Sequence, residues 1–144
     1  MKLVVDIDNT LLPRDKNLVG PRAMTWIRQM HQLGINVALI SNNGGDRIKA
    51  ITRQTNLGTI MRAAKPLPSA YKQITKAMGG GKILFVGDQL VTDVLGAKSS
   101  GHTVVWVQSL GGKEHFITRC TRKLEKFIAN RLEKNGMMPK ERLL

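Results

Sequence analysis

Val4-Val5-Asp6-Ile7-Asp8-Asn9-Thr10 is the stretch that decides the fold: an apolar run ends here in two carboxylates on alternate residues, followed by a hydroxyl. The run favours a buried strand, and at the end of a strand the backbone can turn and bring Asp6 and Asp8 to one site. Two neighbouring carboxylates repel each other unless a cation joins them, and Mg2+ prefers oxygen ligands. For this stretch alone, an acidic turn that ends a strand is the alternative interpretation.

Short apolar segments alternate with helical segments along the chain that follows. Further strands are predicted at 35–40, 59–63, 82–86 and 103–107. Helices are predicted at 21–33, 46–55 and 69–78, and a last one runs through Ala97 and reaches Gly101. Such alternation is typical of a parallel sheet covered by helices on both faces. The predicted fold class is therefore α/β, a three-layer sandwich of Rossmann type with a central parallel sheet of about five strands.

Small polar or charged residues follow four of the predicted strands. They are Asp6 and Asp8, then Ser41 and Asn42, then Lys65 before Pro66, and then Asp88 and Asp93. The carboxyl ends of strands in a doubly wound sheet converge on one crevice, so residues far apart in the sequence can share a site. The order and type of these residues favour a cation-dependent active site over an acidic turn.

The net charge of +13 is the one extreme value of the composition. Residues 1–110 contain no glutamate and six aspartates, of which four belong to the two acidic motifs. Negative charge is thus concentrated where a metal ion needs it, while the surrounding positive charge should attract an anionic substrate, nucleic acid or an anionic membrane. Colloidal solubility alone is the alternative explanation of the charge.

The length of 144 residues predicts one domain spanning 1–144. Apolar residues make up 42% and charged residues 23%, which argues against a disordered or fibrous chain. The sequence shows neither a secretory signal nor an apolar run as long as a membrane span, so a cytoplasmic chain is expected. The single cysteine, Cys120, occupies an apolar helix position and is interpreted as a packing residue.

A basic amphipathic helix is predicted at about 116–134. Its apolar stripe comprises Ile117, Cys120, Leu124, Phe127, Ile128 and Leu132, and lysines and arginines lie on the opposite side. The stripe can pack on the sheet, or the helix can lie on an anionic membrane surface. The helix can do both if its apolar stripe packs on the sheet while its basic face touches lipid head groups. The protein would then lie peripherally on the inner face of a membrane.

Taken in order, four motifs resemble those of the haloacid-dehalogenase-like (HAD) phosphohydrolases. They are D-x-D-x-T at 6–10, the strand-end Ser41, the Lys65-Pro66 pair and G-D-x-x-x-x-D at 87–93. The segments 41–43, 64–66, 87–94 and 116–119 are further similar to the YqeG-type group of subfamily HAD-IIIA. That group is similar to mitochondrial phosphatidylglycerophosphate phosphatases, and the resemblance covers nearly the whole chain.

The resemblance implies a Mg2+-dependent phosphomonoesterase that works through an aspartyl-phosphate. Asp6 would be the nucleophile and Asp8 the general acid and base. Mg2+ would be held by Asp6, the backbone carbonyl of Asp8 and Asp88. The other implied roles are phosphoryl binding by Lys65, Ser41 and Asn42, orientation of Lys65 or a metal-bound water by Asp93, and orientation of the first loop by Thr10.

The intervals 11–40 and 42–64 leave no room for the lid, or cap, domain that many HAD enzymes insert there. A capless site can admit a phosphate presented on a membrane, a protein or a polymer. With the basic helix, this favours phosphatidylglycerophosphate or a related anionic phospholipid as substrate. The alternatives are a soluble sugar or nucleotide phosphate and, in another class, a basic RNA- or ribosome-associated factor; single-strand recognition is disfavoured because aromatic residues make up only 4%.

Overall fold

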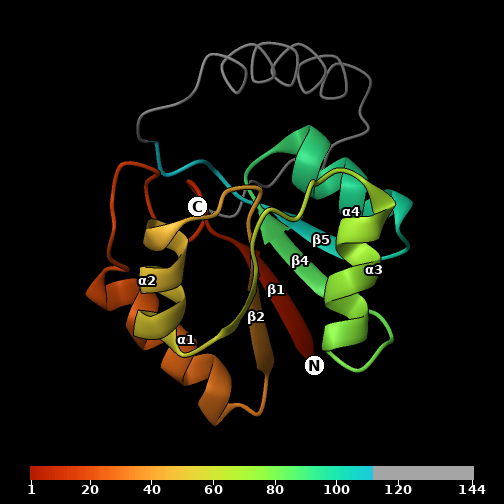
Figure 1. The fold of residues 1–144 in the computed structure, drawn as a ribbon. Helices are drawn as coiled ribbons and strands as arrows, with labels where there is room; N and C mark the ends of the chain where they lie inside the picture. Colours follow the sequence, from red (N-terminus) through yellow and green to blue (C-terminus); the bar gives the residue numbers. More distant parts are fainter. Residues whose placement is uncertain (112–144) are drawn as a thin grey trace. The chain divides into compact units, whose positions relative to one another are not determined.

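Strands and helices alternate along the chain (Figure 1). The computed structural model describes residues 1–111, so the predicted helix at 116–134 and Cys120 lie outside the described residues. The elements in order are β1 (Lys2–Asp6), α1 (Pro21–Gln32), β2 (Asn36–Ile40), α2 (Asp46–Thr55), β3 (Gly58–Ile60), α3 (Pro68–Ala77), β4 (Leu84–Gly87), a π-helix (Leu90–Leu95), α4 (Gly96–Ser99) and β5 (Thr103–Trp106).

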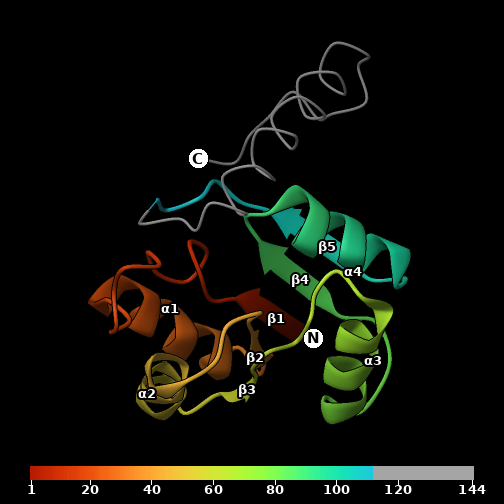
Figure 2. The same ribbon diagram turned by 45° about the horizontal axis from the view of Figure 1, so that its top comes forward.

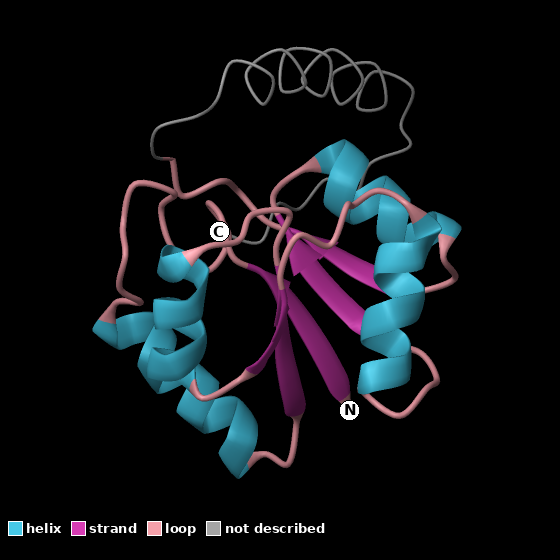
Figure 3. Ribbon diagram, viewed as in Figure 1, coloured by secondary structure: helices cyan, strands magenta, loops and turns pink. Residues whose placement is uncertain are grey.

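The five strands form one parallel sheet in the order β3-β2-β1-β4-β5. In the centre, Val4 of β1 is in register with Ala38 of β2 on one side and with Phe85 of β4 on the other. Figure 3 shows the strands side by side between two groups of helices. The predicted parallel sheet of about five strands is therefore confirmed.

Alternating residues of the strands supply two separate hydrophobic cores. On one face, Leu3 and Val5 pack with Ile27 of α1 and Ile51 of α2. On the other face, Val4 belongs to the core that includes residues of α3 and α4. Figure 2 shows α1 and α2 on one side of the sheet and α3 and α4 on the other. Because β1 is buried on both faces, its apolar run is continuous, as expected of a central parallel strand.

The chain reverses its direction across the sheet at β1. From β1 it runs outward through β2 to β3, and it then crosses by α3 to β4 on the opposite side of β1. Ligands of open α/β sheets bind in the crevice at such a reversal, beyond the carboxyl ends of the strands. The fold thus places the residues that follow β1, β2 and β4 around one point.

Two local features differ from the sequence-based expectation. The third strand covers only Gly58–Ile60, and a π-helix at Leu90–Leu95 precedes the short α4, where one helix was expected. Within residues 1–111, single helices or loops join the strands, without an inserted cap domain. No helix in this range is both long and apolar enough to cross a membrane.

The π-helix is packed against α3 through one aromatic side chain. Tyr71 of α3 is fully buried, and its hydroxyl donates a hydrogen bond to the backbone carbonyl of Thr92. Gly96 permits this packing, because a Cβ at that position would collide with the Tyr71 hydroxyl and ring.

We expect Gly96→Ala to lower the free energy of unfolding by about 1–3 kcal/mol, the usual cost of overpacking a core. Chemical denaturation followed by circular dichroism measures it. Gly58→Ala is the matched control, since a Cβ on Gly58 meets nothing within 4 Å. Equal stability of the two variants would contradict the packing role of Gly96.

Candidate active site

The acidic stretch after β1 turns sharply at Asn9. Asp6 ends the strand, and Asn9 adopts a left-handed conformation with φ of 62°, which asparagine tolerates better than most residues. The Asn9 amide donates to the Leu12 carbonyl at 2.8 Å, and the Asn9 side chain accepts from the Arg14 amide at 3.1 Å. The turn keeps both Asp6 and Asp8 buried at the carboxyl edge of the sheet.

Lys65 joins two carboxylates from different elements, Asp6 at the end of β1 and Asp93 in the π-helix after β4. Its Nζ lies 2.5 Å from Asp6 Oδ1 and 2.6 Å from Asp93 Oδ1, and its side chain is only 3% exposed. Burial acts to lower the pKa of Lys65, but the two carboxylates outweigh burial and raise that pKa above its ordinary value. Lys65 is therefore a permanently charged group beside the predicted nucleophile.

The predicted nucleophile has an unusual protonation equilibrium. Burial raises the pKa of Asp6 from 3.8 to about 8; the Lys65 ammonium opposes this rise, and the Asp93 carboxylate adds to it. The second oxygen, Asp6 Oδ2, is buried and has no hydrogen-bond partner among the described residues. A cation or an electrophile beside Oδ2 would remove the electrostatic cost of ionising Asp6.

The π-helix explains the spacing of G-D-x-x-x-x-D. Its wide turn brings Asp93 back over the end of β4, where Asp93 Oδ2 accepts from the Gln89 amide at 3.0 Å. A Cβ on Gly87 would collide with the Asp93 carboxyl group, so glycine is required at that position. Both Asp93 oxygens are thus engaged, one by Lys65 and one by the backbone.

Asn42 contacts the backbone of Lys65 with both polar atoms of its side chain. Its Oδ1 accepts from the Lys65 amide at 2.7 Å, and its Nδ2 donates to the Lys65 carbonyl at 2.9 Å. Asn42 was expected to bind substrate. In the structure its amide fixes the segment that carries Lys65, and substrate binding by Asn42 stays a prediction.

The Asp8 carboxylate is surrounded by three donors. The Ser41 hydroxyl and the Asn43 amide donate to Asp8 Oδ2 at 3.1 and 2.7 Å, and Arg47 Nη1 lies 2.7 Å from Asp8 Oδ1. The hydroxyl of Ser41, expected on the phosphoryl oxygens, thus contacts Asp8. Asn43 and Arg47 were not predicted as site residues. The one signal in the sequence was for Arg47, which stands at the start of a basic helix, directly after the turn that ends a strand.

Three carboxylates form a candidate metal site. Oxygens of Asp6, Asp88 and Asp93 all lie within 4.8 Å of one another. Thr10 Oγ1 donates to Asp88 Oδ1 at 3.2 Å. Three carboxylates and one ammonium leave an excess of negative charge, and Asp6 Oδ2 has no hydrogen-bond partner among the described residues. The donors are all oxygens, so the residues present fit a hard divalent cation such as Mg2+.

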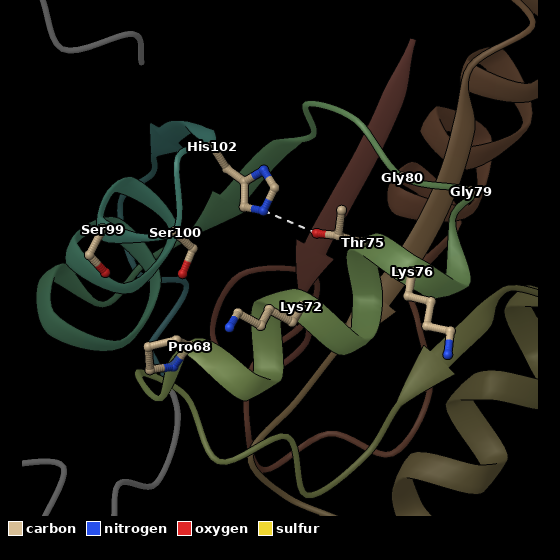
Figure 4. A pocket seen from close by; sticks show the side chains of 9 residues that line it. All are labelled: Pro68, Lys72, Thr75, Lys76, Gly79, Gly80, Ser99, Ser100 and His102. Carbon is tan, nitrogen blue, oxygen red and sulfur yellow. Dashed lines mark hydrogen bonds between the residues drawn. The ribbon is translucent and has the colours of Figure 1, made fainter.

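A separate groove of about 760 Å3 lies between α3 and the turn after α4 (Figure 4). Its lining includes Lys72 and Thr75 from α3 and Ser100 and His102 from the turn, with a Thr75 to His102 hydrogen bond of 3.0 Å. None of the predicted site residues lines this groove. The carboxylates and Lys65 therefore form a distinct site at the edge of the sheet.

Comparison with known proteins agrees with this geometry. Residues 4–101 match the model of the haloacid dehalogenase-like hydrolases. The chain is 33% identical over 136 residues to the probable phosphatase YqeG of Bacillus subtilis, covering 93% of this chain and 79% of that protein. It is 24% identical over 149 residues to phosphatidylglycerophosphate phosphatase 1 of Arabidopsis thaliana, covering 95% of this chain but 43% of the plant protein.

Solved structures share the fold at lower sequence identity. D,D-heptose 1,7-bisphosphate phosphatase from B. bronchiseptica, complexed with magnesium and phosphate, aligns with a TM-score of 0.59 and 20% identity over 76% of this chain and 82% of that one. A putative subfamily IIIA hydrolase from Legionella pneumophila aligns with a TM-score of 0.58 and 17% identity over 92% and 89% of the two chains.

The fold and the family match define a hydrolase of the α/β class. The chain belongs to the haloacid dehalogenase-like hydrolase family and is a phosphatase.

The raised pKa of Asp6 would make cation binding at this carboxylate dependent on pH. In the metal-free protein, Asp6 stays largely protonated in the folded state up to about pH 8, whereas in the unfolded state it ionises at about pH 4. The free energy of unfolding therefore falls as the pH rises from about 4 to about 8. A cation binds the carboxylate form and reverses this effect. We therefore expect Mg2+ to raise the melting temperature more at about pH 9 than at about pH 6.

Differential scanning fluorimetry with and without Mg2+ at the two pH values measures this difference. Asp6→Asn is the control and should lose both the Mg2+ effect and its pH dependence. An equal Mg2+ effect at both pH values, or its retention in Asp6→Asn, would refute the role of Asp6 as a ligand.

Proposed function

We propose that the protein is a Mg2+-dependent phosphomonoesterase that works through an aspartyl-phosphate on Asp6. Its proposed substrate is phosphatidylglycerophosphate or a related anionic phospholipid. The observation that supports the chemistry is the buried Lys65, in contact with both Asp6 and Asp93. The substrate proposal draws on the plant relative and on the surface that surrounds the site.

In the first step, an oxygen of Asp6 attacks the substrate phosphorus, and the bond between phosphorus and the ester oxygen breaks. Asp8 gives its proton to the departing alcohol, so the alcohol leaves neutral and the phosphoryl group is bound to Asp6. The Lys65 ammonium, 2.5 Å from Asp6 Oδ1, stabilises the negative charge of the phosphoryl oxygens. Asp93 holds that ammonium in position.

In the second step, Asp8 takes a proton from a water molecule, and the water oxygen attacks phosphorus. The bond between phosphorus and Asp6 breaks, which releases inorganic phosphate and restores the Asp6 carboxylate. Ser41, Asn43 and Arg47 fix the orientation of Asp8 by hydrogen bonds to its two oxygens. Because Asp8 first donates and then accepts, one carboxyl group serves both steps.

Asp6, Asp88 and the backbone carbonyl of Asp8 would hold the cation. Asp93 is a weaker candidate ligand, because both of its oxygens already accept hydrogen bonds. When bound, Mg2+ supplies positive charge that lets an anionic phosphate approach an anionic nucleophile.

Exposed apolar side chains next to the site support a lipid substrate. Leu67 follows Lys65 by two residues, and Leu95 follows Asp93 by two. Trp106 donates its indole N–H to the Asp88 carbonyl at 3.0 Å. These three side chains are 40–57% exposed. Together with the +13 charge, an apolar rim of this kind suits an anionic membrane surface, where the protein would act peripherally.

A panel of phosphate monoesters with Mg2+ tests the proposal. It comprises phosphatidylglycerophosphate in mixed micelles, the deacylated head group of that lipid, a sugar phosphate and a nucleotide. We expect the lipid to have the highest kcat/KM. Asp6→Asn should lower kcat by at least about a thousandfold and Lys65→Met by about a hundredfold or more.

The rim is tested by Leu67→Ser and Leu95→Ser, which should reduce hydrolysis of the lipid but not of its deacylated head group. Leu33→Ser is the matched control, since Leu33 is 70% exposed and lies before β2, away from the carboxyl ends of the strands. A preference for a soluble sugar or nucleotide phosphate would leave the chemistry intact and rule out the lipid. Full activity of Asp6→Asn would rule out the chemistry.

A further inference from the structure

Three arginines from different segments converge on the turn that follows β2. Arg14 Nη2 donates to the Asn43 side chain at 3.2 Å, and Arg47 extends from the first turn of α2 to Asp8. The Arg62 amide donates to the Asn43 carbonyl at 3.0 Å, and its side chain lies over Gly44, whose Cβ would be 2.9 Å from Arg62 Nε. We call Arg14, Arg47 and Arg62 the arginine cluster.

The positive charge of this cluster is only partly compensated. Within residues 1–111, the ion pairs of the three arginines comprise only Arg47 with Asp8. The nearby Asp46 pairs with Lys49 at 3.3 Å, and its side chain is 96% exposed. Asp15, which follows Arg14, is also exposed. One buried carboxylate pairs with the three guanidinium groups, and the two neighbouring aspartates are exposed to solvent, so the positive charge of the cluster exceeds the negative charge paired with it.

Arg47 has N–H groups that are not used by its contacts within the protein. A guanidinium has five N–H groups. The recorded bonds of Arg47 are Nε to the Lys16 carbonyl at 2.8 Å, Nη1 to Asp8 at 2.7 Å and a long contact of 3.5 Å from Nη2 to the Pro13 carbonyl. The two carbonyls fix the plane of the guanidinium. A fixed planar fork with unused N–H groups is suited to bidentate binding of a phosphate.

The cluster lies where the alcohol part of the substrate leaves. Asp8, the proposed proton donor, must contact the departing oxygen, and Arg47 lies directly beside Asp8. An anion bound to Arg47 would thus be within about 8 Å of that oxygen, a distance that a short polyol chain spans.

We propose that the arginine cluster is a subsite for a second anionic group, a phosphate or phosphodiester, on the alcohol part of the substrate. The substrate class is then a phosphate monoester whose alcohol carries another phosphate a few bonds away. The inference rests on the proposed function, because it takes Asp8 as the proton donor. It applies equally to a lipid and to a soluble bisphosphate.

Two soluble probes that differ in one phosphate test the subsite: propyl phosphate and 1,3-propanediol bisphosphate. The wild type should have a higher kcat/KM for the bisphosphate. Arg62→Gln and Arg47→Gln should each lower the bisphosphate to monophosphate ratio of kcat/KM by about tenfold, as expected for a lost charge-assisted hydrogen bond. Arg62→Lys should restore part of that ratio.

Arg53→Gln is the matched control, because Arg53 is exposed on the same helix, about 9 Å further from the site. It should leave the ratio unchanged. An equal loss for both probes in Arg62→Gln and Arg47→Gln would overturn the subsite and assign these arginines to the orientation of Asp8 or to the fold. A similar change of ratio in Arg53→Gln would overturn it in favour of overall charge.

Binding is measured in parallel by the rise in melting temperature that each probe causes. If the wild type hydrolyses neither probe, that result counts against the proposed function alone. The subsite is then tested by the melting temperatures. A larger rise with the bisphosphate, lost in Arg62→Gln and kept in Arg53→Gln, supports the subsite. Equal rises with the two probes overturn it. Comparison of kcat/KM for the lipid and for its deacylated head group then shows whether the second anion belongs to a lipid or to a soluble substrate.

Discussion

The buried contact of Lys65 with Asp6 and Asp93 is the interaction on which the rest of the site depends. The three side chains are 3–7% exposed, so each charge has lost most of its hydration, and only close pairing offsets that cost. The pairing requires three segments to be held accurately: the end of β1, the segment before α3 and the π-helix after β4. Much of the unusual local structure serves this purpose.

The backbone around Lys65 and Asp93 is fixed from several directions. Asn42 binds both polar groups of the Lys65 backbone, and Tyr71 binds the carbonyl next to Asp93. Gly87 leaves the space that the Asp93 carboxyl group occupies. Contacts within the protein therefore determine where the ammonium lies, and this position sets the electrostatic environment of Asp6, the predicted nucleophile.

Sequence patterns predicted the sheet and most of the charged groups of the site. Apolar strands that alternate with helices imply a parallel sheet, and the rule that strand ends converge was sufficient to bring Asp6, Lys65, Asp88 and Asp93 together. Individual hydrogen bonds were not predictable, because they depend on the direction of each side chain. Ser41 and Asn42, predicted to contact phosphate, also bind Asp8 and the Lys65 backbone, contacts that the sequence did not predict. Arg47 was overlooked because a basic helix offers several equivalent cations until its orientation is known.

The central claim is that Asp6 becomes phosphorylated and that Asp8 is required to release the phosphate. Asp8→Asn, incubated with Mg2+ and radiolabelled p-nitrophenyl phosphate, isolates this step, because nitrophenolate leaves without a proton donor whereas hydrolysis of the aspartyl-phosphate needs the base. After acid quenching and proteolysis, the account predicts label on the peptide that contains Asp6, lost on treatment with hydroxylamine. The absence of label, or label on another residue, would contradict it.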